Sequence, residues 1–278
     1  MAVSNDIAGE PAAEAAPAKT HPGSAPLLST ERLTIRVGGR ILVRDLSVGF
    51  APGEFTAVLG RNGSGKSLTL QTLAGLRPPA TGRVNLNGTP LTRMARPAIA
   101  RQLGFLAQDL EEGFVTTAIE SVLIGRHPHL SLWEWESDRD DLIAHRALAA
   151  VDMEKLAARH TDTLSGGERR RVAIASLLAQ DAAVFLLDEP TNHLDPHHQL
   201  AVLSLFRALA DAGHTVIATL HDPTLAVRFA DRAMLLAGDG EWTAGSATEE
   251  ITAPRLTSLY LTPIVEIRQD GRRVFVPE

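Results

Sequence analysis

Short apolar runs alternate with longer stretches of helical spacing along most of the chain from residue 33 onward. Several runs are apolar at consecutive positions, which favours strands that helices cover on both faces. Strands that alternate with helices predict an α/β protein with a mainly parallel sheet. The runs that we interpret as strands cover residues 55–59, 103–107, 184–187, 215–220 and 233–236.

Residues 109–163 interrupt this alternation. They contain no strong run of strand type, and residues 140–159 combine Ala, Leu and charged residues at helical spacing. We therefore expect a helical subdomain inserted into the α/β core.

The two ends of the chain differ from this core. Residues 1–29 are rich in Ala and Pro, which predicts a disordered leader. Residues 251–278 are expected to form a C-terminal extension, in which alternation around Asp270 and Gly271 predicts a β-hairpin. The intervening residues 30–250 are expected to form one domain.

Composition excludes several classes of protein. The 278 residues include no Cys, which excludes thiolate catalysis and iron–sulfur clusters. The 27 basic and 33 acidic residues give a net charge of -6, which argues against nucleic acid as a partner. No window approaches the roughly 18 to 20 apolar residues of a membrane-spanning helix, and the acidic leader lacks the features of a signal peptide. We expect a cytoplasmic protein whose anion sites are local.

A glycine-rich segment lies between the strand expected at 55–59 and a helical run at 68–76. In a strand–loop–helix context this spacing predicts a phosphate-binding loop, because successive backbone N–H groups and a helix N-terminus face the phosphate. Its lysine adds a point charge and its last serine can ligate Mg²⁺. The residues of the loop are Gly60, Arg61, Asn62, Gly63, Ser64, Gly65, Lys66 and Ser67.

The apolar run 184–187 ends in two carboxylates, Asp188 and Glu189, followed by Pro190. In a phosphate-loop protein the Asp at this position holds Mg²⁺, directly or through water, beside Ser67. Glu189 is then placed to accept a proton from the attacking water. These residues predict phosphoanhydride hydrolysis.

A second glycine-rich segment, 164–168, begins a helix that we expect to run to about Ala179. Ser165 and Glu168 have the spacing of a capping box. Two glycines in the first turn are poor helix formers, so capping alone does not explain Gly166 and Gly167. Close approach of the backbone to an anion explains them better.

Together, segment 164–168, the phosphate loop and the Asp188–Glu189 strand end closely resemble the ATP-binding-cassette (ABC) ATPases. The resemblance covers about residues 33–245. It implies a P-loop NTPase (RecA-like) core with a mainly parallel sheet, an antiparallel β part near the N-terminus and a helical insertion subdomain. It also implies ATP and Mg²⁺ as cofactors.

Further residues match motifs of this family. Gln108 resembles the glutamine that touches Mg²⁺ or water and links to the transport subunit, and His221 resembles the histidine that contacts the γ-phosphate. Segment 192–195, with Asp195, resembles a loop that crosses the dimer interface. The resemblance therefore implies Glu189, His221, Lys66 and Gln108 as catalytic residues. It implies Ser67, Gln108 and Asp188 as metal ligands.

The chain departs from the family at Val37, where an aromatic residue commonly stacks on adenine. In the family, ATP lies between the phosphate loop of one subunit and the segment matching Ser165, Gly166 and Gly167 of another. One copy of each segment in this chain implies a homodimer with two ATP sites.

Residues 125–130 look like a Gly-Arg-x-Pro-His-Leu stretch that is common in ATPases of bacterial importers for iron siderophores, haem and vitamin B12. This resemblance implies an energy-coupling subunit on the cytoplasmic face of the inner membrane. It would dock a transmembrane permease through residues 108–130, with a periplasmic or lipid-anchored substrate-binding protein as an indirect partner.

Three alternatives remain. The chain could be a soluble cassette ATPase that acts on ribosomes or DNA, although such proteins usually carry two cassettes or a long coiled-coil insertion. It could serve an importer or exporter of another substrate. A regulator that binds nucleotide without hydrolysis is disfavoured by the presence of both Glu189 and His221.

Overall fold

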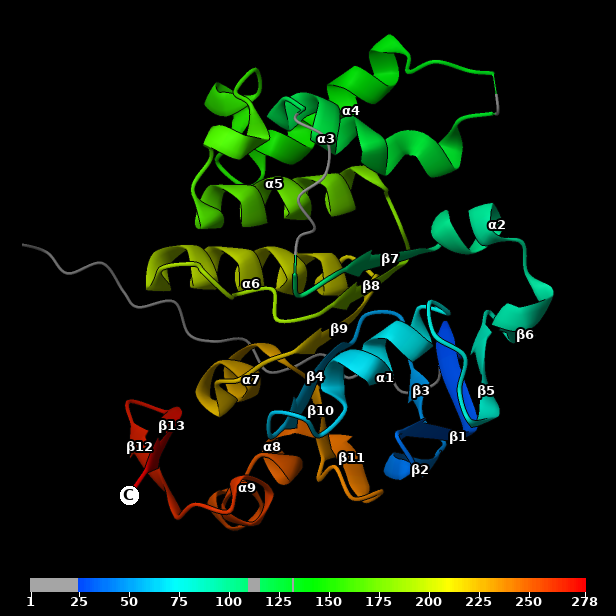
Figure 1. Cartoon of the computed structure of the whole chain (residues 1–278). Helices are drawn as coiled ribbons and strands as arrows, with labels where there is room; N and C mark the ends of the chain where they lie inside the picture. The colour runs from blue at the N-terminus through cyan, green and yellow to red at the C-terminus, as the bar shows by residue number, and fades with distance from the viewer. Residues whose placement is uncertain (1–24, 110–115, 132) are drawn as a thin grey trace, which may run out of the picture.

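The computed structural model describes residues 25–109, 116–131 and 133–278. Most of the leader predicted at 1–29 lies outside this part of the chain. In the view of Figure 1 a layer of helices lies above a central sheet, and a second sheet lies to one side. This arrangement confirms the predicted α/β architecture with an inserted helical subdomain.

The central sheet has six strands, in the order β11-β10-β4-β9-β8-β7. All neighbours are parallel except β11, which runs antiparallel to β10. The registers Leu106↔Leu187 and Leu187↔Ala218 bring the C-terminal ends of β7, β8 and β9 to one edge. The strands are β4 (Phe55–Gly60), β7 (Leu103–Leu106), β8 (Val184–Leu187), β9 (Thr215–Thr219), β10 (Arg232–Leu236) and β11 (Trp242–Ser246).

The second sheet is antiparallel and is formed by the N-terminal part of the chain, as predicted. Its order is β2-β1-β5-β6, and β3 pairs with β1. Val37, the position without the stacking aromatic, ends β1 and is exposed. The strands are β1 (Leu28–Val37), β2 (Arg40–Leu46), β3 (Gly49–Phe50), β5 (Thr81–Leu86) and β6 (Thr89–Pro90).

Helices cover both faces of the central sheet. The inserted block and the second glycine-rich segment, 164–168 (the signature-like segment), supply α3 (Ala118–Leu123), η2 (Ile124–His129), α4 (Asp138–Ala149), η3 (Glu154–Leu156), η4 (Thr161–Thr163) and α5 (Gly166–Ala179). The other helices are α1 (Lys66–Leu73), η1 (Leu91–Arg93), α2 (Arg96–Ala100), α6 (Pro196–Asp211), α7 (Pro223–Phe229), α8 (Ala247–Glu250) and α9 (Ala253–Tyr260).

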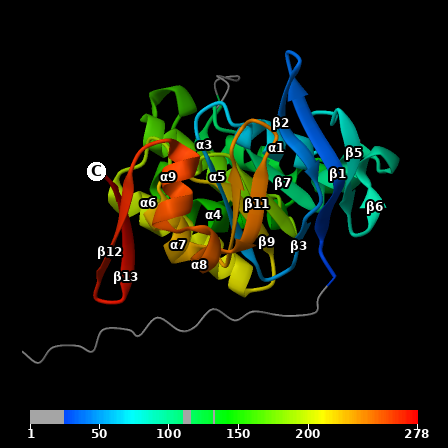
Figure 2. The same cartoon turned by 90° about the horizontal axis from the view of Figure 1, so that it is seen from below.

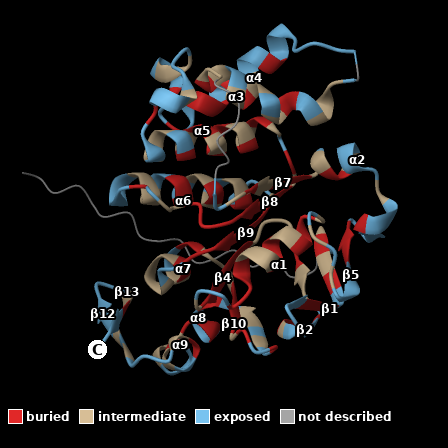
Figure 3. Cartoon of the chain, in the orientation of Figure 1, coloured by how far each residue is buried: buried red, intermediate tan, exposed pale blue. Residues whose placement is uncertain are grey.

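The buried residues form two hydrophobic clusters, one on each face of the central sheet. In β8, Phe185 and Leu187 join the cluster beneath α3 to α7, whereas Val184 and Leu186 join the cluster shared with α1 and the antiparallel sheet. Figure 3 shows this buried band along the strands, with exposed residues on the outer helices. Burial on both faces explains why the strands are apolar at consecutive positions.

The inserted block is attached tightly to α5. A Cβ on Gly125 would lie 2.1 Å from the backbone oxygen of Ser176, so only glycine permits this approach. The buried Arg126 donates from Nε to Asp140 Oδ1 (2.8 Å) and from Nη1 to the Ala179 carbonyl (2.7 Å). The stretch that resembles importer ATPases therefore joins η2, α4 and α5.

A two-stranded hairpin, β12 (Ile264–Gln269) and β13 (Arg272–Pro277), lies at the predicted turn of Asp270 and Gly271. It packs on α7, and Phe275 is buried there. Figure 2 shows the hairpin and the antiparallel sheet on opposite sides of the molecule. None of the helices in the described ranges has the length and apolarity that crossing a membrane requires.

Candidate active site

The glycine-rich loop connects β4 to α1. Gly65 has φ 100°, a left-handed conformation that favours glycine, and the helix begins at the next residue. Lys66 is 5% exposed, and its Nζ donates to the carbonyl of Gly60 (2.8 Å) and to that of Arg61 (3.3 Å). Burial lowers the pKa of Lys66 from its ordinary value, and the negative charges of Glu189 and Asp188 oppose this shift. The ammonium is thus held at the start of the helix.

The structure brings all four predicted catalytic residues to one cavity of about 360 Å³. A volume of this size lies within the range of small-molecule sites. The cavity is also at the C-terminal edge of the parallel sheet, where open α/β sheets bind ligands. Its lining residues are Asn62, Gly63, Gly65, Lys66, Ser67, Leu68, Gln108, Glu189 and His221.

Three residues of the loop give it shape without lining this cavity. A Cβ on Gly60 would lie 2.4 Å from Ser64 Oγ, so this position has no room for a side chain. Ser64 is 2% exposed, and Arg61 Nη2 donates to the carbonyl of Ala237 (3.3 Å).

The three residues predicted to hold Mg²⁺ all carry side-chain oxygens, and two of them, Ser67 and Gln108, line the cavity, whereas Asp188 lies outside its lining. Ser67 Oγ lies 3.4 Å from Gln108 Oε1, within hydrogen-bonding distance. Asp188 is 1% exposed, and its Oδ1 accepts a hydrogen bond from Thr219 Oγ1 (2.7 Å). Hydroxyl, amide and carboxylate oxygens are the ligands that Mg²⁺ prefers.

Glu189 lies at the centre of a hydrogen-bonded group. Its Oε1 is 2.5 Å from His221 Nε2, and its Oε2 accepts from Asn192 Nδ2. Its backbone N–H donates to Thr219 Oγ1 (2.7 Å). Its φ of 49° is uncommon for a residue with a side chain and marks a local constraint of the kind found at functional sites. The carboxylate predicted to act as a base therefore has two side-chain partners, and a third side chain holds the backbone of the same residue.

Sequence reasoning missed two residues that hold this group, Thr219 and Arg170, and it missed the contact of Asn192 with Glu189. Arg170 is 1% exposed and donates to backbone carbonyls at the ends of β7 and β8. Arg170 lies four and seven residues before the buried Ile174 and Leu177, a spacing that puts it on the inner face of α5. That periodicity could have identified it.

The signature-like segment does not line this cavity. Ser165 accepts from the Glu168 N–H (3.2 Å) and Glu168 Oε2 accepts from the Ser165 N–H (2.7 Å), so the predicted capping box is present. A Cβ on Gly167 would lie 3.1 Å from the His193 carbonyl, which gives this glycine a packing role. A Cβ on Gly166 would meet only the His193 Cβ, at 3.9 Å. The described residues of this chain therefore leave open space beside Gly166 where a side chain or a bound group could fit.

Asp195 also lies outside the lining of the cavity. It is the N-cap of α6, where its Oδ1 accepts from the His198 N–H (2.9 Å) and its Oδ2 lies 2.9 Å from His198 Nδ1. The backbone hydrogen bond from His198 lowers the pKa of Asp195.

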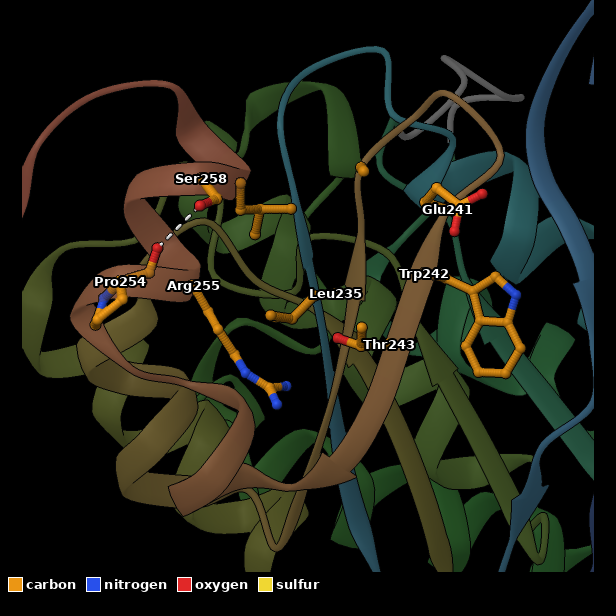
Figure 4. A pocket seen from close by; sticks show the side chains of 9 residues that line it. Leu235, Glu241, Trp242, Thr243, Pro254, Arg255 and Ser258 are labelled. Atoms are coloured by element: carbon orange, nitrogen blue, oxygen red, sulfur yellow. Dashed lines mark hydrogen bonds between the residues drawn. The ribbon is translucent and has the colours of Figure 1, made fainter.

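A second cavity, of about 400 Å³, lies between α9 and strands β10 and β11. In Figure 4, Leu235 and Thr243 from the strands face Arg255 and Ser258 from α9. Arg255 is the one cation among the residues that line this cavity, and it forms an ion pair with Glu250. Because that pair neutralises it, the first cavity is the better phosphate site.

Comparisons with known proteins agree with this geometry. The profile of the family described as ABC transporter matches residues 43–192. The ferric enterobactin transport ATP-binding protein FepC of Escherichia coli (strain K12) is 38% identical, over 84% of this chain and 86% of its own length. The hemin import ATP-binding protein HmuV of Burkholderia thailandensis is 39% identical, over 90% of this chain and 100% of its own length.

Solved structures give the same result. A metal-chelate type ABC transporter in an inward-facing conformation superposes with a TM-score of 0.79 at 30% identity, and the match covers 92% of this chain and 98% of the other. A dimeric ATP-binding cassette in a post-hydrolysis state, bound to ADP and Pi, gives 0.70 at 26% identity, over 79% and 98% of the two chains. The chain therefore belongs to the ABC transporter family, as one of its ATP-binding subunits.

Proposed function

We propose that the chain hydrolyses ATP to drive import of a metal chelate: an iron siderophore, haem or cobalamin. It works as a homodimer docked on a membrane permease at the cytoplasmic face of the inner membrane. A periplasmic or lipid-anchored protein delivers the substrate. The observation that carries the proposal is the single cavity at which Lys66, Ser67, Gln108, Glu189 and His221 converge.

The cavity supplies what hydrolysis of a phosphoanhydride requires. Backbone N–H groups at the start of α1 and the ammonium of Lys66 bind the phosphates. Glu189 accepts a proton from the attacking water while the water oxygen bonds to the γ-phosphorus. The bond between the γ-phosphorus and the bridging oxygen breaks, and that oxygen leaves with the β-phosphate of ADP. His221, hydrogen-bonded to Glu189, reaches the same cavity and stabilises the negative charge that develops on the phosphate.

The residues also fit a Mg²⁺ ion. Ser67 Oγ and Gln108 Oε1 are close to each other, and Asp188 Oδ2 is free of the Thr219 hydrogen bond that Oδ1 accepts. These three residues would hold the ion, which would neutralise charge on the phosphates.

Two features support a dimer that shares its ATP sites. Ser165, Gly166 and Gly167 lie outside the lining of the cavity, although they form a helix N-terminus suited to an anion. The space beside Gly166 is left open by this chain. A two-fold pair would place that helix N-terminus of one subunit against ATP held by the other.

The substrate class is supported by the relatives. Their names assign them to ferric enterobactin, petrobactin, hemin and cobalamin transport or import. The chelate itself would contact the permease and the substrate-binding protein.

The inserted block is the proposed docking face for the permease, through residues 108–130, of which 110–115 lie outside the described part of the chain. Just beyond it, Trp133 and Trp135 are 90% and 86% exposed. Exposed tryptophans are enriched at protein interfaces, so these side chains support a partner on this block.

The hydrolytic activity is tested with purified protein and the Lys66→Ala variant. We expect Mg²⁺-dependent release of phosphate from ATP that falls by at least about 10²-fold in the variant, because the charge held at the phosphate loop is lost. Lys155→Ala removes an exposed lysine and should leave the rate unchanged. Unchanged activity in Lys66→Ala would show that the phosphate loop is not the active site.

The transport assignment needs a separate experiment. We expect the chain to co-purify from solubilised membranes with a polytopic permease. A deletion strain should lose growth on one of three sources: siderophore iron, haem or corrinoid. Co-purification with ribosomal proteins would instead support a soluble cassette ATPase.

A further inference from the structure

Arg170 connects the helical layer to the active site. It lies on α5, five residues after Ser165, and is the largest of the fully buried side chains in the described part of the chain, with 1% exposure. Its guanidinium leaves the helix and reaches the C-terminal ends of β7 and β8. One buried side chain thus touches three elements of the fold.

Within the described ranges, every hydrogen bond of this guanidinium goes to a main-chain carbonyl. Nη1 donates to Ala107 (2.5 Å) and Gln108 (3.3 Å), and Nη2 donates to Asp188 (2.6 Å) and Glu189 (2.8 Å). Nε makes a long contact of 3.5 Å with the carbonyl of Pro190. An arginine has five N–H donors in a planar fork, so the full set is used.

This arrangement is costly for the fold. Loss of water lowers the pKa of Arg170 to about 10, although the negative charges of Asp188, Glu189 and Asp109 oppose the shift. Among the described residues no carboxylate forms an ion pair with it. The guanidinium offsets this cost only through the main-chain carbonyls to which it donates, because these acceptors would lose a donor without it. The role of the arginine therefore depends on which carbonyls these are.

The carbonyls that Arg170 holds belong to catalytic segments. The Gln108 and Glu189 side chains line the nucleotide cavity, and their own main chains accept from the guanidinium. Glu189 has the uncommon φ of 49°, which needs support from its surroundings. A shift of about 1 Å at a catalytic group can cost about 10²-fold in rate.

We propose that Arg170 is a positioning residue for ATP hydrolysis: it fixes the main chain at Gln108 and Glu189 relative to α5. The inference rests on the proposed function. Because α5 begins at Ser165, Gly166 and Gly167, a displacement of its N-terminus by nucleotide on a partner subunit is transmitted to both catalytic segments of the same chain. Arg170 thereby links the two ATP sites of the dimer.

The first test compares Arg170→Gln, Arg170→Lys and Arg171→Gln. We expect Arg170→Gln to lower kcat by about 10- to 100-fold, while the Kd for a fluorescent ATP analogue changes by less than about twofold, since Arg170 does not touch the phosphate loop. Lysine restores the charge without the fork and should give an intermediate kcat. Arg171 is the matched control, because it donates to the carbonyls of Val151 (3.1 Å) and Asp152 (3.4 Å), outside the cavity lining. Arg171→Gln should keep the wild-type kcat.

The second test is a double-mutant cycle read by single-turnover hydrolysis. If Arg170 acts through Glu189, Arg170→Gln lowers the rate much less in a Glu189→Gln background than in the wild type. Equal losses in both backgrounds would overturn the inference. A folded Arg170→Lys protein with the wild-type kcat would also overturn the inference. This variant provides the test if Arg170→Gln does not fold. These outcomes presuppose an active wild type that Lys66→Ala inactivates, so failure of the proposed function is distinguishable.

Discussion

Thr219 joins the two acidic residues that follow β8, through the carboxylate of Asp188 and the backbone of Glu189. Its hydroxyl donates to Asp188 Oδ1 and accepts from the Glu189 N–H, both at 2.7 Å, and the side chain is fully buried. Thr219→Val keeps the shape but leaves a buried N–H without a partner. We expect the free energy of unfolding to fall by about 1 to 3 kcal/mol and kcat to fall by at least about tenfold.

Thr215→Val is the matched control for this change. Thr215 is equally buried on the same strand and donates to the Ala51 carbonyl (2.9 Å), away from the cavity. Urea unfolding and ATP hydrolysis should separate the two variants: both lose stability, and only Thr219→Val loses activity. Parallel losses of activity would show that Thr219 acts through stability alone.

At the residue scale, motif spacing predicted Lys66, Ser67 and Glu189, and the family resemblance implied Gln108 and His221; all five side chains meet in the cavity. Such motifs record which residue types the chemistry needs. Thr219 and Arg170 were not predicted, because their roles come from contacts between segments far apart in the sequence. Of the neighbours Arg169, Arg170 and Arg171, helical periodicity places Arg170 on the inner face of α5, but it does not show which carbonyls the side chain reaches.

At the scale of elements, the approach of η2 to α5 depends on Gly125. A Cβ there would lie 2.1 Å from the backbone oxygen of Ser176, which cannot move without shifting the helix. We expect Gly125→Ala to lower the free energy of unfolding by about 1 to 3 kcal/mol. Gly166→Ala is the control, because its new Cβ would lie 3.9 Å from the His193 Cβ, an ordinary contact distance. The thermal midpoint of this variant should not fall. Equal midpoints for the two variants would argue against this packing.

The link between η2 and α4 predicts an acid sensitivity. Hydrogen bonds from Ser137 and then from Arg126 hold the pKa of Asp140 well below its usual range. The folded state therefore binds fewer protons than the unfolded state. The stabilisation is fully present above about pH 4 and is lost as pH falls through the folded value.

Urea unfolding of the wild type and of Asp140→Asn at several pH values measures the pH-dependent stabilisation that Asp140 contributes. The difference in free energy of unfolding should be largest at neutral pH and shrink in acid. Asp141→Asn, a change at the exposed neighbour, should show little pH-dependent difference. A constant difference for Asp140→Asn across the series would contradict the proposed linkage.

At this scale the sequence predicted the five parallel strands of the central sheet to within one residue at each end, because burial on both faces leaves an unbroken apolar run. It did not predict β11, the antiparallel strand at the edge of that sheet. It did not predict how the inserted block is attached. That attachment depends on the fit of Gly125 and Arg126 to the end of α5, which no local pattern encodes.

At the scale of the whole molecule, the residues implied in ATP binding fall into two groups. One group is the phosphate loop, with five of its eight residues in the lining of the cavity, and the other, with Ser165, Gly166 and Gly167, lies entirely outside that lining. The central claim is that the two groups form one site only between two chains.

Complementation between two inactive chains tests this claim most directly. Lys66→Ala disables the phosphate loop. Gly166→Asp is compatible with its own helix, where an acidic residue in the first turn is favourable, but it repels a phosphate from the partner. Each variant alone should be inactive. In an equal mixture about half of the dimers are mixed, each with one intact site, so hydrolysis should return to as much as about a quarter of the wild-type rate. A mixture no more active than its two components would contradict the shared site.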